Sequence, residues 1–157
     1  MRRKDREITD PAEIRGIIDA SKLLHLALND EGCPYVVPMH YGYEYIGALP
    51  VLYMHCASEG HRLDLIRRDP RACIELETDV EITSGGEVPC LYGCNFRSVI
   101  ARGTVSVLPA GEEKLRALRL LMKHQTGRDF DITPQMAQTV QVLRFAAEEL
   151  TAKARQV

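Results

Sequence analysis

The side chains best suited to chemistry gather where a predicted strand turns into a short predicted helix, between positions 55 and 70. The turn Ser58-Glu59-Gly60 ends the strand, and the residues after it carry apolar side chains at helical spacing. The first amides of a helix lack an intrahelical acceptor and lie at the positive end of its dipole, which suits a bound phosphate. His61 and Arg62 occupy this first turn, where cations are unfavourable unless an anion binds between them. The pattern therefore predicts an anion site.

The same basic residues have a plainer interpretation. Arg62 shares the short helix with Arg67 and Arg68, and the three could form a solvated basic face. Arg62 is nevertheless well suited to a phosphate, because its planar guanidinium can meet two oxygens at once. His61 is less suited, since its charge near neutral pH depends on its surroundings. The residue types alone leave both interpretations open.

The cysteines suggest a second kind of site. Cys90 and Cys94 are separated by three residues, with His55 and His61 as imaginable further ligands. A single pair at this spacing is a weak zinc signal, so we predict no metal site. The five cysteines are odd in number and scattered, which favours reduced thiols in a cytosolic protein over a secreted disulfide framework.

Length and composition indicate one soluble domain spanning residues 1–157, in which 45% of the residues are hydrophobic and can build a core. The formal net charge of -2 argues against a general nucleic-acid binder. No apolar run approaches the roughly 18 residues needed to cross a bilayer. The charged start, Met1 to Glu7, does not have the pattern of a signal peptide. We therefore expect a cytoplasmic protein without nucleic-acid or membrane partners.

Hydrophobic periodicity predicts the elements that would position these side chains. Asp10-Pro11 is typical of a helix start, with Asp10 as the N-cap, and Asn29-Asp30-Glu31-Gly32 is typical of a hairpin turn. Pro38 cannot donate to a ladder, so its strand should have a free edge or a bulge there, and Gly103 indicates another bend or bulge. Strands are expected at 24–28, 35–41, 51–57, 72–76 and 96–108, and helices at 11–18, 61–68 and 115–127.

The C-terminal tail is ambiguous between helix and strand. Residues 137–154 are rich in helix formers, yet Val140 and Val142 alternate with polar neighbours, so we favour a strand over residues 139–150. The element order is then helix, three strands, short helix, two strands, helix and final strand. Because antiparallel hairpins dominate, the predicted fold class is mainly β (α+β), an antiparallel β-barrel with accessory helices.

Four motifs follow one another along roughly residues 1–107. They are Arg2 to Ile8, Tyr35 to Met39 with Tyr41-Gly42-Tyr43, the strand–turn–helix at 55–70, and Phe96 to Ile100 with Gly103. Each motif is weak singly, but four in the right order are fairly specific. Together they resemble the FMN-binding split-barrel proteins of the pyridoxamine 5'-phosphate oxidase-like family, in the form of its nitroimidazole-reductase (Nim) branch.

This resemblance implies an antiparallel split β-barrel and a homodimer with two FMN molecules in clefts between the subunits. One strand would border the isoalloxazine ring, the end of the next would lie along the ribityl chain, and the helix start would hold the phosphate. A last pair of residues would come from the other subunit. In this order, the implied cofactor-binding residues are Val36, Val37, Pro38 and Met39; His55 and Cys56; Gly60, His61 and Arg62; and Arg97 with Ser98.

The resemblance also implies flavin chemistry. The oxidase activity that names the wider family depends on a C-terminal extension, which has no obvious counterpart before Val157. Reduction of a small molecule, for example a nitroaromatic compound, fits better, with FMN supplying the redox chemistry and the protein supplying orientation. The alternative is a non-enzymatic flavin- or haem-binding protein, with His55 or His61 as axial ligand. The sequence identifies neither a catalytic residue nor the substrate.

Overall fold

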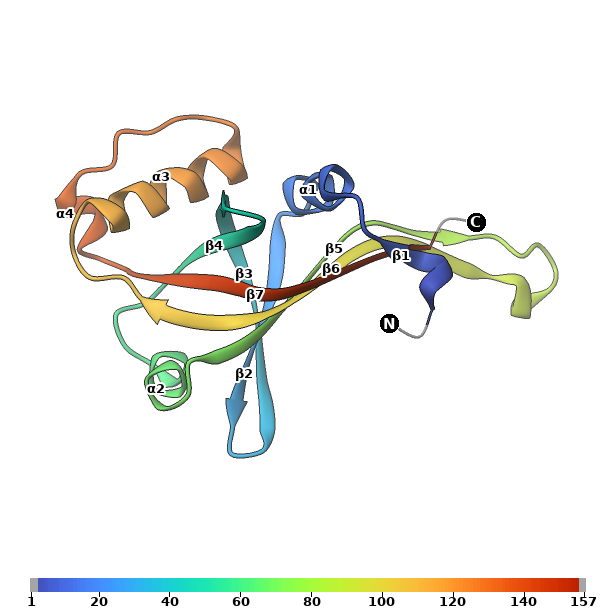
Figure 1. Cartoon of the computed structure of the whole chain (residues 1–157), viewed down its shortest axis with the longest axis horizontal. Helices are drawn as coiled ribbons and strands as arrows, with labels where there is room; N and C mark the ends of the chain where they lie inside the picture. Colours follow the sequence, from blue (N-terminus) through green and yellow to red (C-terminus); the bar gives the residue numbers. More distant parts are fainter. Residues whose placement is uncertain (1–2, 156–157) are drawn as a thin grey trace.

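The computed structural model, which describes residues 3–155, shows an antiparallel sheet that closes on itself (Figure 1). The strand order is β1-β7-β4-β3-β2-β5-β6, and β6 pairs again with β7 to complete the ring. The predicted mainly β fold is confirmed, while Arg2, where the first motif begins, lies outside the described residues. The strands are β1 (Glu7–Ile8), β2 (Leu23–Asp30), β3 (Cys33–Ile46), β4 (Leu49–Cys56), β5 (Arg71–Thr83), β6 (Gly93–Val107) and β7 (Gln141–Arg155).

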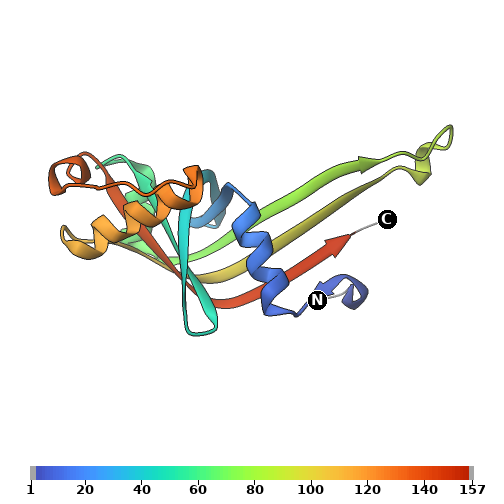
Figure 2. The same ribbon diagram turned by 90° about the horizontal axis from the view of Figure 1, so that it is seen from above.

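Helices lie around the outside of this barrel (Figures 1 and 2). The first begins as predicted, because the Asp10 carboxylate accepts a hydrogen bond of 3.0 Å from the Ala12 amide and a proline fills the first position. In the described part of the chain, no helix is long and apolar enough to cross a membrane. The helices are α1 (Pro11–Ala20), α2 (His61–Arg68), α3 (Glu112–Thr126) and α4 (Pro134–Ala137), with 3-10 turns η1 (Lys4–Arg6) and η2 (Pro89–Leu91).

The barrel interior is one continuous apolar core. Alternate residues of each strand point into it, as do Leu24, Leu26 and Leu28 of β2, which are 0%, 0% and 2% exposed. A second, smaller core lies outside the barrel, where Val51 and Tyr53 of β4 meet apolar side chains of α3. Strand β4 is therefore buried on both faces, which fits its nearly unbroken run of apolar residues.

Strand β3 changes its partner halfway along its length, and this is where the barrel splits. Its residues 33–40 pair with β2, and its residues 41–46 pair with β4. Pro38 lies opposite His25 in the first segment, where no strand of residues 3–155 pairs with the other edge of β3. The missing amide of Pro38 therefore costs no ladder hydrogen bond, and the free edge predicted there is confirmed.

Gly103 lies at a bulge, as predicted. The pairing of β6 with β7 shifts register between Arg102 and Gly103. A Cβ atom on Gly103 would collide with the backbone of Ala146 on β7, so only glycine allows the two strands to approach this closely.

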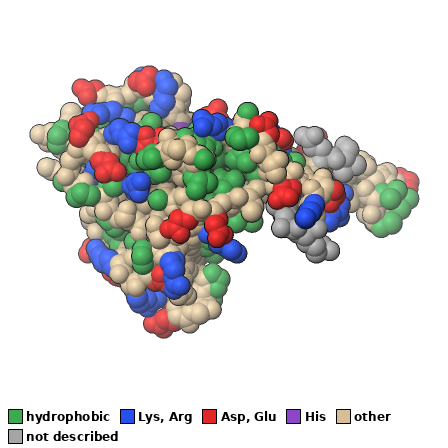
Figure 3. All heavy atoms as spheres, in the orientation of Figure 1, with side chains coloured by type: hydrophobic (Ala, Val, Ile, Leu, Met, Phe, Trp, Pro, Cys, Tyr) green, Lys and Arg blue, Asp and Glu red, His purple; other side chains and the backbone are tan. Residues whose placement is uncertain are grey.

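Strands β5 and β6 continue beyond the barrel as a two-stranded arm (Figures 1 and 2). Their register shifts between Thr78 and Glu81, where the arm begins, and η2 lies at its tip. The arm exposes Ile82 (75%) and Leu91 (65%), and Figure 3 shows hydrophobic side chains gathered at its end. The sequence analysis ended the first of these strands at position 76 and so missed the arm, because Thr78 interrupts the apolar alternation there.

The tail forms the predicted strand, although β7 runs to Arg155 and is longer than the predicted 139–150. Alternation outweighs helix propensity here because β7 has two neighbours, pairing with β4 over residues 141–146 and with β6 over residues 143–155. Helix α4 and strand β1 were not predicted, since four and two residues are too few to show a period.

The contact between α3 and β3 generates a stability prediction. A Cβ on Gly42 of β3 would collide with the backbone of Leu121 in α3, so Gly42→Ala should lower the free energy of unfolding by roughly 1–3 kcal/mol. The matched control is Gly16→Ala in α1, where nothing lies within 4 Å of the added Cβ and helix propensity should raise stability by about 0.5–1 kcal/mol. Urea denaturation of both variants measures the difference, and equal midpoints would contradict this packing.

Candidate functional site

The strand–turn–helix that carries the chemistry-bearing side chains forms as predicted. Strand β4 ends at Cys56 and α2 begins at His61. Gly60 caps the helix with a φ of 132°, a backbone conformation that favours glycine, and an added Cβ would point into open space. Its carbonyl accepts the amides of Leu63 (2.9 Å) and Asp64 (3.4 Å). The amides before these lack an intrahelical acceptor and lie at the positive end of the helix.

Arg62 has a buried nitrogen without a partner. Its Nε is shielded from solvent and forms no hydrogen bond with any residue between positions 3 and 155. The Cys56 thiol lies beside the guanidinium, and its pKa is raised because burial outweighs the opposing effect of the Arg62 charge. An unsatisfied buried donor is unfavourable by about 1–3 kcal/mol, so this position suits a ligand with acceptor oxygens. The residues at the turn therefore fit an anionic group.

The His61 side chain already has a carboxylate partner within the chain. Its exposed ring donates from Nε2 to the Asp30 carboxylate at 2.8 Å and meets the Tyr35 ring edge-on, with the ring centroids 5.4 Å apart. Arg68 donates to Asp30 (3.0 Å) and to Glu31 (3.1 Å). The pKa of Asp30 is lowered, first by the hydrogen bond from His61 and then by that from Arg68. The β2–β3 turn thus binds both ends of α2.

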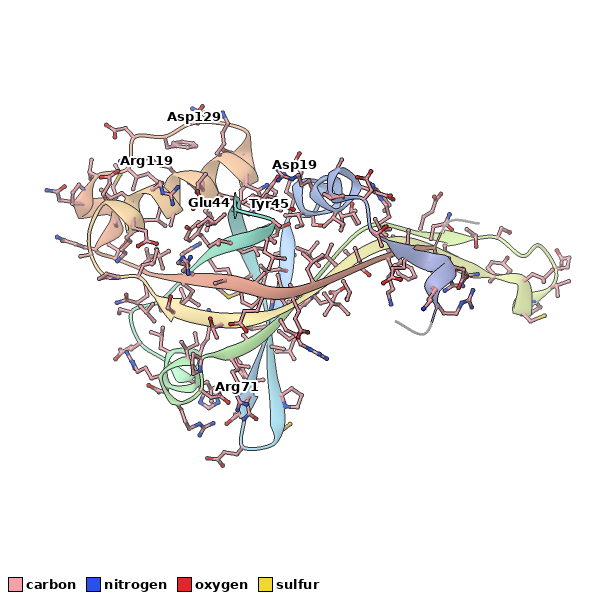
Figure 4. The ribbon with its side chains drawn as sticks, viewed as in Figure 1. Asp19, Glu44, Tyr45, Arg71, Arg119 and Asp129 are labelled. Carbon is pink, nitrogen blue, oxygen red and sulfur yellow. The ribbon has the colours of Figure 1, made fainter. Side chains whose placement is uncertain are left out.

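The carboxylate of Asp69, directly after the helix, also has a partner within the chain. It accepts two hydrogen bonds from the Arg71 guanidinium, at 2.9 and 2.7 Å, and its pKa is lowered by them. Figure 4 shows Arg71 near α2 and the β2–β3 hairpin. Arg67 in turn donates to Asp64 at 2.9 Å. The three arginines of α2 therefore differ, because Arg67 and Arg68 have carboxylate partners whereas Arg62 faces inward with its Nε unpaired.

His55 and Cys56 project to opposite faces of β4. Cys56 lies against the barrel core beside Arg62. His55 lines an apolar hollow of about 330 Å³ on the other face of the strand, under α3 and α4. The structure brings Cys56, but not His55, to the predicted phosphate turn. The other side chains of this hollow are Leu118, Leu121, Met122, Phe130, Asp131, Ile132, Met136 and Val140.

The side chains of the β3 segment predicted to border the ring also point alternately to opposite faces of the sheet. Val36 and Pro38 point away from the barrel and are exposed, Val36 at 54%. Val37 and Met39 point toward the core, and Met39 is 6% exposed. Only the outward pair and the strand backbone can therefore border a ligand that lies outside the barrel.

Arg97 and Ser98 lie far along the sheet from the turn. They pair with residues 77 and 78 of β5, close to the register shift where the arm begins, whereas α2 lies at the opposite end of the sheet (Figure 1). Ser98 is buried, and Arg97 is bound to the Asp79 carboxylate. Within one chain, the structure does not bring these two residues to His61 and Arg62.

The strands also form a surface that sequence reasoning missed, called here the outer sheet face. Cross-strand register aligns Pro38, His25, Glu75 and Ile100, so their side chains share the face turned away from the core. A groove of about 500 Å³ opens at one end of it, near the β2–β3 turn, where Ala27, Cys73 and Arg102 line it. Strand alternation could have predicted the face only once the strand pairing was known. Its outward residues on β3, β2, β5 and β6 are Val36, Pro38, Leu23, His25, Ala27, Cys73, Glu75, Glu77, Ser98, Ile100 and Arg102.

Known proteins share both the sequence pattern and the fold. The sequence profile of the family described as pyridoxamine 5'-phosphate oxidase matches residues 10–154. A solved structure from Bacteroides thetaiotaomicron, described as a 5-nitroimidazole antibiotic resistance protein, is 30% identical, with a TM-score of 0.80 over 94% of this chain and 86% of that chain. No curated protein matches the sequence.

Two more distant structures show the same fold. The flavocytochrome Anf3 from Azotobacter vinelandii is 19% identical, with a TM-score of 0.78 over 100% of this chain and 72% of that chain. The FAD and haem binding protein from Mycobacterium smegmatis is 17% identical, with a TM-score of 0.80 over 97% and 74%. The profile match over nearly the whole described chain shows that this protein belongs to the pyridoxamine 5'-phosphate oxidase family.

Proposed function

We propose that this chain binds FMN, with the phosphate at the turn between β4 and α2, and acts as a cytoplasmic flavin-dependent reductase of small molecules. The observation that carries the proposal is the buried, unpaired Nε of Arg62 beside the open start of α2. Relatives described as flavin- and haem-binding proteins, and the neighbour described as a nitroimidazole resistance protein, support it.

The phosphate would be held by Arg62 and by the first amides of α2. Arg62 can offer its Nε and a terminal nitrogen as a bidentate pair to phosphate oxygens. Gly60 leaves room for those oxygens to approach the backbone, since it has no Cβ. His61 would contribute less than the sequence predicted, because Asp30 already occupies its Nε2.

When bound, FMN would supply the two-electron transfer between a reduced nicotinamide and the substrate. The residues of this chain would supply position and shielding. Val36, Pro38 and the free edge of β3 would border the ring from the outer sheet face, and Cys56 would lie between them and the phosphate anchor. A nitroaromatic compound is the substrate class that we favour.

The site would be completed by a second copy of the chain. Pro38 and Ser98 share the outer sheet face, but β2 and β5 lie between their strands, so they are roughly 14 Å apart at the spacing of neighbouring strands. Two copies related by a two-fold axis and placed face to face would bring Ser98 of one toward the flavin of the other, while Arg97, whose side chain points to the opposite face of β6, would contribute through its backbone. Exposed apolar side chains favour such burial, with Leu23, Val36 and Ile100 at 44%, 54% and 39%.

A second candidate function is a non-enzymatic flavin- or haem-binding protein. The hollow lined by His55 favours it, because an imidazole within a largely apolar pocket is the usual setting for an axial haem ligand. Met122 and Met136 line the same hollow.

A visible absorption spectrum distinguishes these functions. Protein reconstituted with FMN should show the two broad bands of oxidised flavin, which a reduced nicotinamide should bleach and a nitroaromatic acceptor should restore. A sharp Soret band after addition of haem, with no flavin retained, would instead support the haem-binding alternative. Flavin that is retained but never bleached would support passive binding.

The position of the phosphate anchor can be tested with two arginines of one helix. Arg62→Ala should weaken FMN binding about 10- to 150-fold, because a charge-assisted hydrogen bond contributes roughly 1.5–3 kcal/mol. Arg68→Ala removes the same charge from the far end of α2 and should change the affinity little. Fluorescence titration of FMN measures both, and coinciding curves would place the phosphate elsewhere.

The proposed dimer can be tested through the outer sheet face. Val36→Lys should convert a dimer into a monomer and abolish FMN retention, because it places a charge in the apolar part of the interface. Met136→Lys on α4 is the matched control, since Met136 is similarly exposed (61%) but lies on another surface. Analytical ultracentrifugation measures the masses. A wild-type chain that sediments as a monomer at every concentration would contradict the shared site.

A further inference from the structure

Three potential metal ligands meet on the outer sheet face, away from the turn that would hold phosphate. His25 of β2 pairs directly with Glu75 of β5, and Glu77 follows two residues later on the same side. The Nδ1 of His25 lies 3.3 Å from a Glu75 oxygen and 3.9 Å from a Glu77 oxygen. One ligand atom from each residue falls within 4.8 Å of the other two.

The charges of this cluster are not balanced by the protein. Within residues 3–155, neither Glu75 nor Glu77 forms an ion pair with a lysine or arginine, and each has only His25 as its ion-pair partner. Lys153 lies two strands from Glu77, where its ammonium is placed over the Phe96 ring. The pKa of Glu75 is raised, first by burial and then by the neighbouring Glu77 carboxyl. A half-buried and an exposed carboxylate therefore share one imidazole.

We infer that His25, Glu75 and Glu77 form a binding site for Zn²⁺. Zinc binds imidazole nitrogen and carboxylate oxygen at about 2.0–2.2 Å, so the ligand atoms of a tetrahedral ion lie roughly 3.3 Å apart. The His25–Glu75 separation already has this value, and the His25–Glu77 separation needs only a rotamer adjustment. The fourth position is left to water.

The scaffold favours a site that forms before the metal binds. All three side chains project from paired strands, whose backbone is fixed by the ladder between β2 and β5. Every ligand comes from one chain, so the site does not depend on the proposed dimer or on flavin. The bound ion would neutralise two carboxylates on a face whose neighbours, Leu23 and Ile100, are apolar. Neutralisation of this kind is required wherever such a face becomes covered.

Zinc binding is tested on the full-length, flavin-free chain by isothermal titration with Zn²⁺ and by the absorption spectrum of the Co²⁺ form. We expect one ion per chain. His25→Ala and Glu75→Gln should each weaken binding at least tenfold and remove the visible cobalt bands. Glu149→Gln, on the same side of β7, two strands from β5, is the matched control and should bind as the wild type does. Thermal unfolding without metal verifies that each variant is folded.

Three results would overturn the inference. The first is a wild-type chain that binds no zinc at micromolar concentrations. The second is a His25→Ala variant that is folded and binds as tightly as the wild type. The third is a thiolate charge-transfer band in the cobalt spectrum, which would assign the ion to the free cysteines. None of these results bears on FMN binding, so this inference and the proposed function can fail separately.

Discussion

Strand β7 holds the molecule together through two ladders, one to β4 and one to β6. Residues 143–146 of this strand take part in both ladders, so its polar backbone is satisfied on each edge at the point where the ring closes. Closure buries the inner face of β4, α3 covers its outer face, and together they fix the direction in which its last residues leave the barrel. Only four residues separate the end of β4 from the start of α2, which leaves Gly60 little freedom in where it presents the helix amides. The proposed phosphate anchor is thus a consequence of how the barrel closes.

A strand also limits how much of a linear motif can contact one ligand. Successive side chains point to opposite faces, so His55 and Cys56 are separated by the thickness of the sheet although they are adjacent in sequence. The same rule divides Val36 and Pro38 from Val37 and Met39. A resemblance that assigns a whole strand segment to a cofactor therefore names about twice as many side chains as can contact it, because only every second side chain points toward that face. The remaining residues contribute backbone or packing, and their substitution tests stability rather than binding.

The features that could be predicted from sequence are those encoded locally. The Asp10 cap depends on one side-chain carboxylate, and the free edge at Pro38 and the bulge at Gly103 each depend on one residue with unusual backbone chemistry; all three are confirmed. The tail was predictable because its alternation spans enough residues. The cluster of His25 and Glu75 was not, since it depends on a pairing between strands 50 residues apart that no local pattern specifies. The arm was missed for a local reason, because Thr78 interrupts the apolar alternation of β5 before Val80 and Ile82 resume it.

The charge distribution around α2 explains why one arginine among three is special. Asp30 and Glu31 sit on the β2–β3 turn and accept hydrogen bonds from His61 and Arg68, which binds the helix to the barrel and leaves these two side chains less available to a ligand. Arg62 lies on the inward side of the same helix, where no carboxylate of residues 3–155 reaches its Nε. A solvated basic face would expose all three cations alike. The observed arrangement instead divides the arginines into two with carboxylate partners, Arg67 and Arg68, and one, Arg62, that stays available. This division favours the anion site over the plainer interpretation.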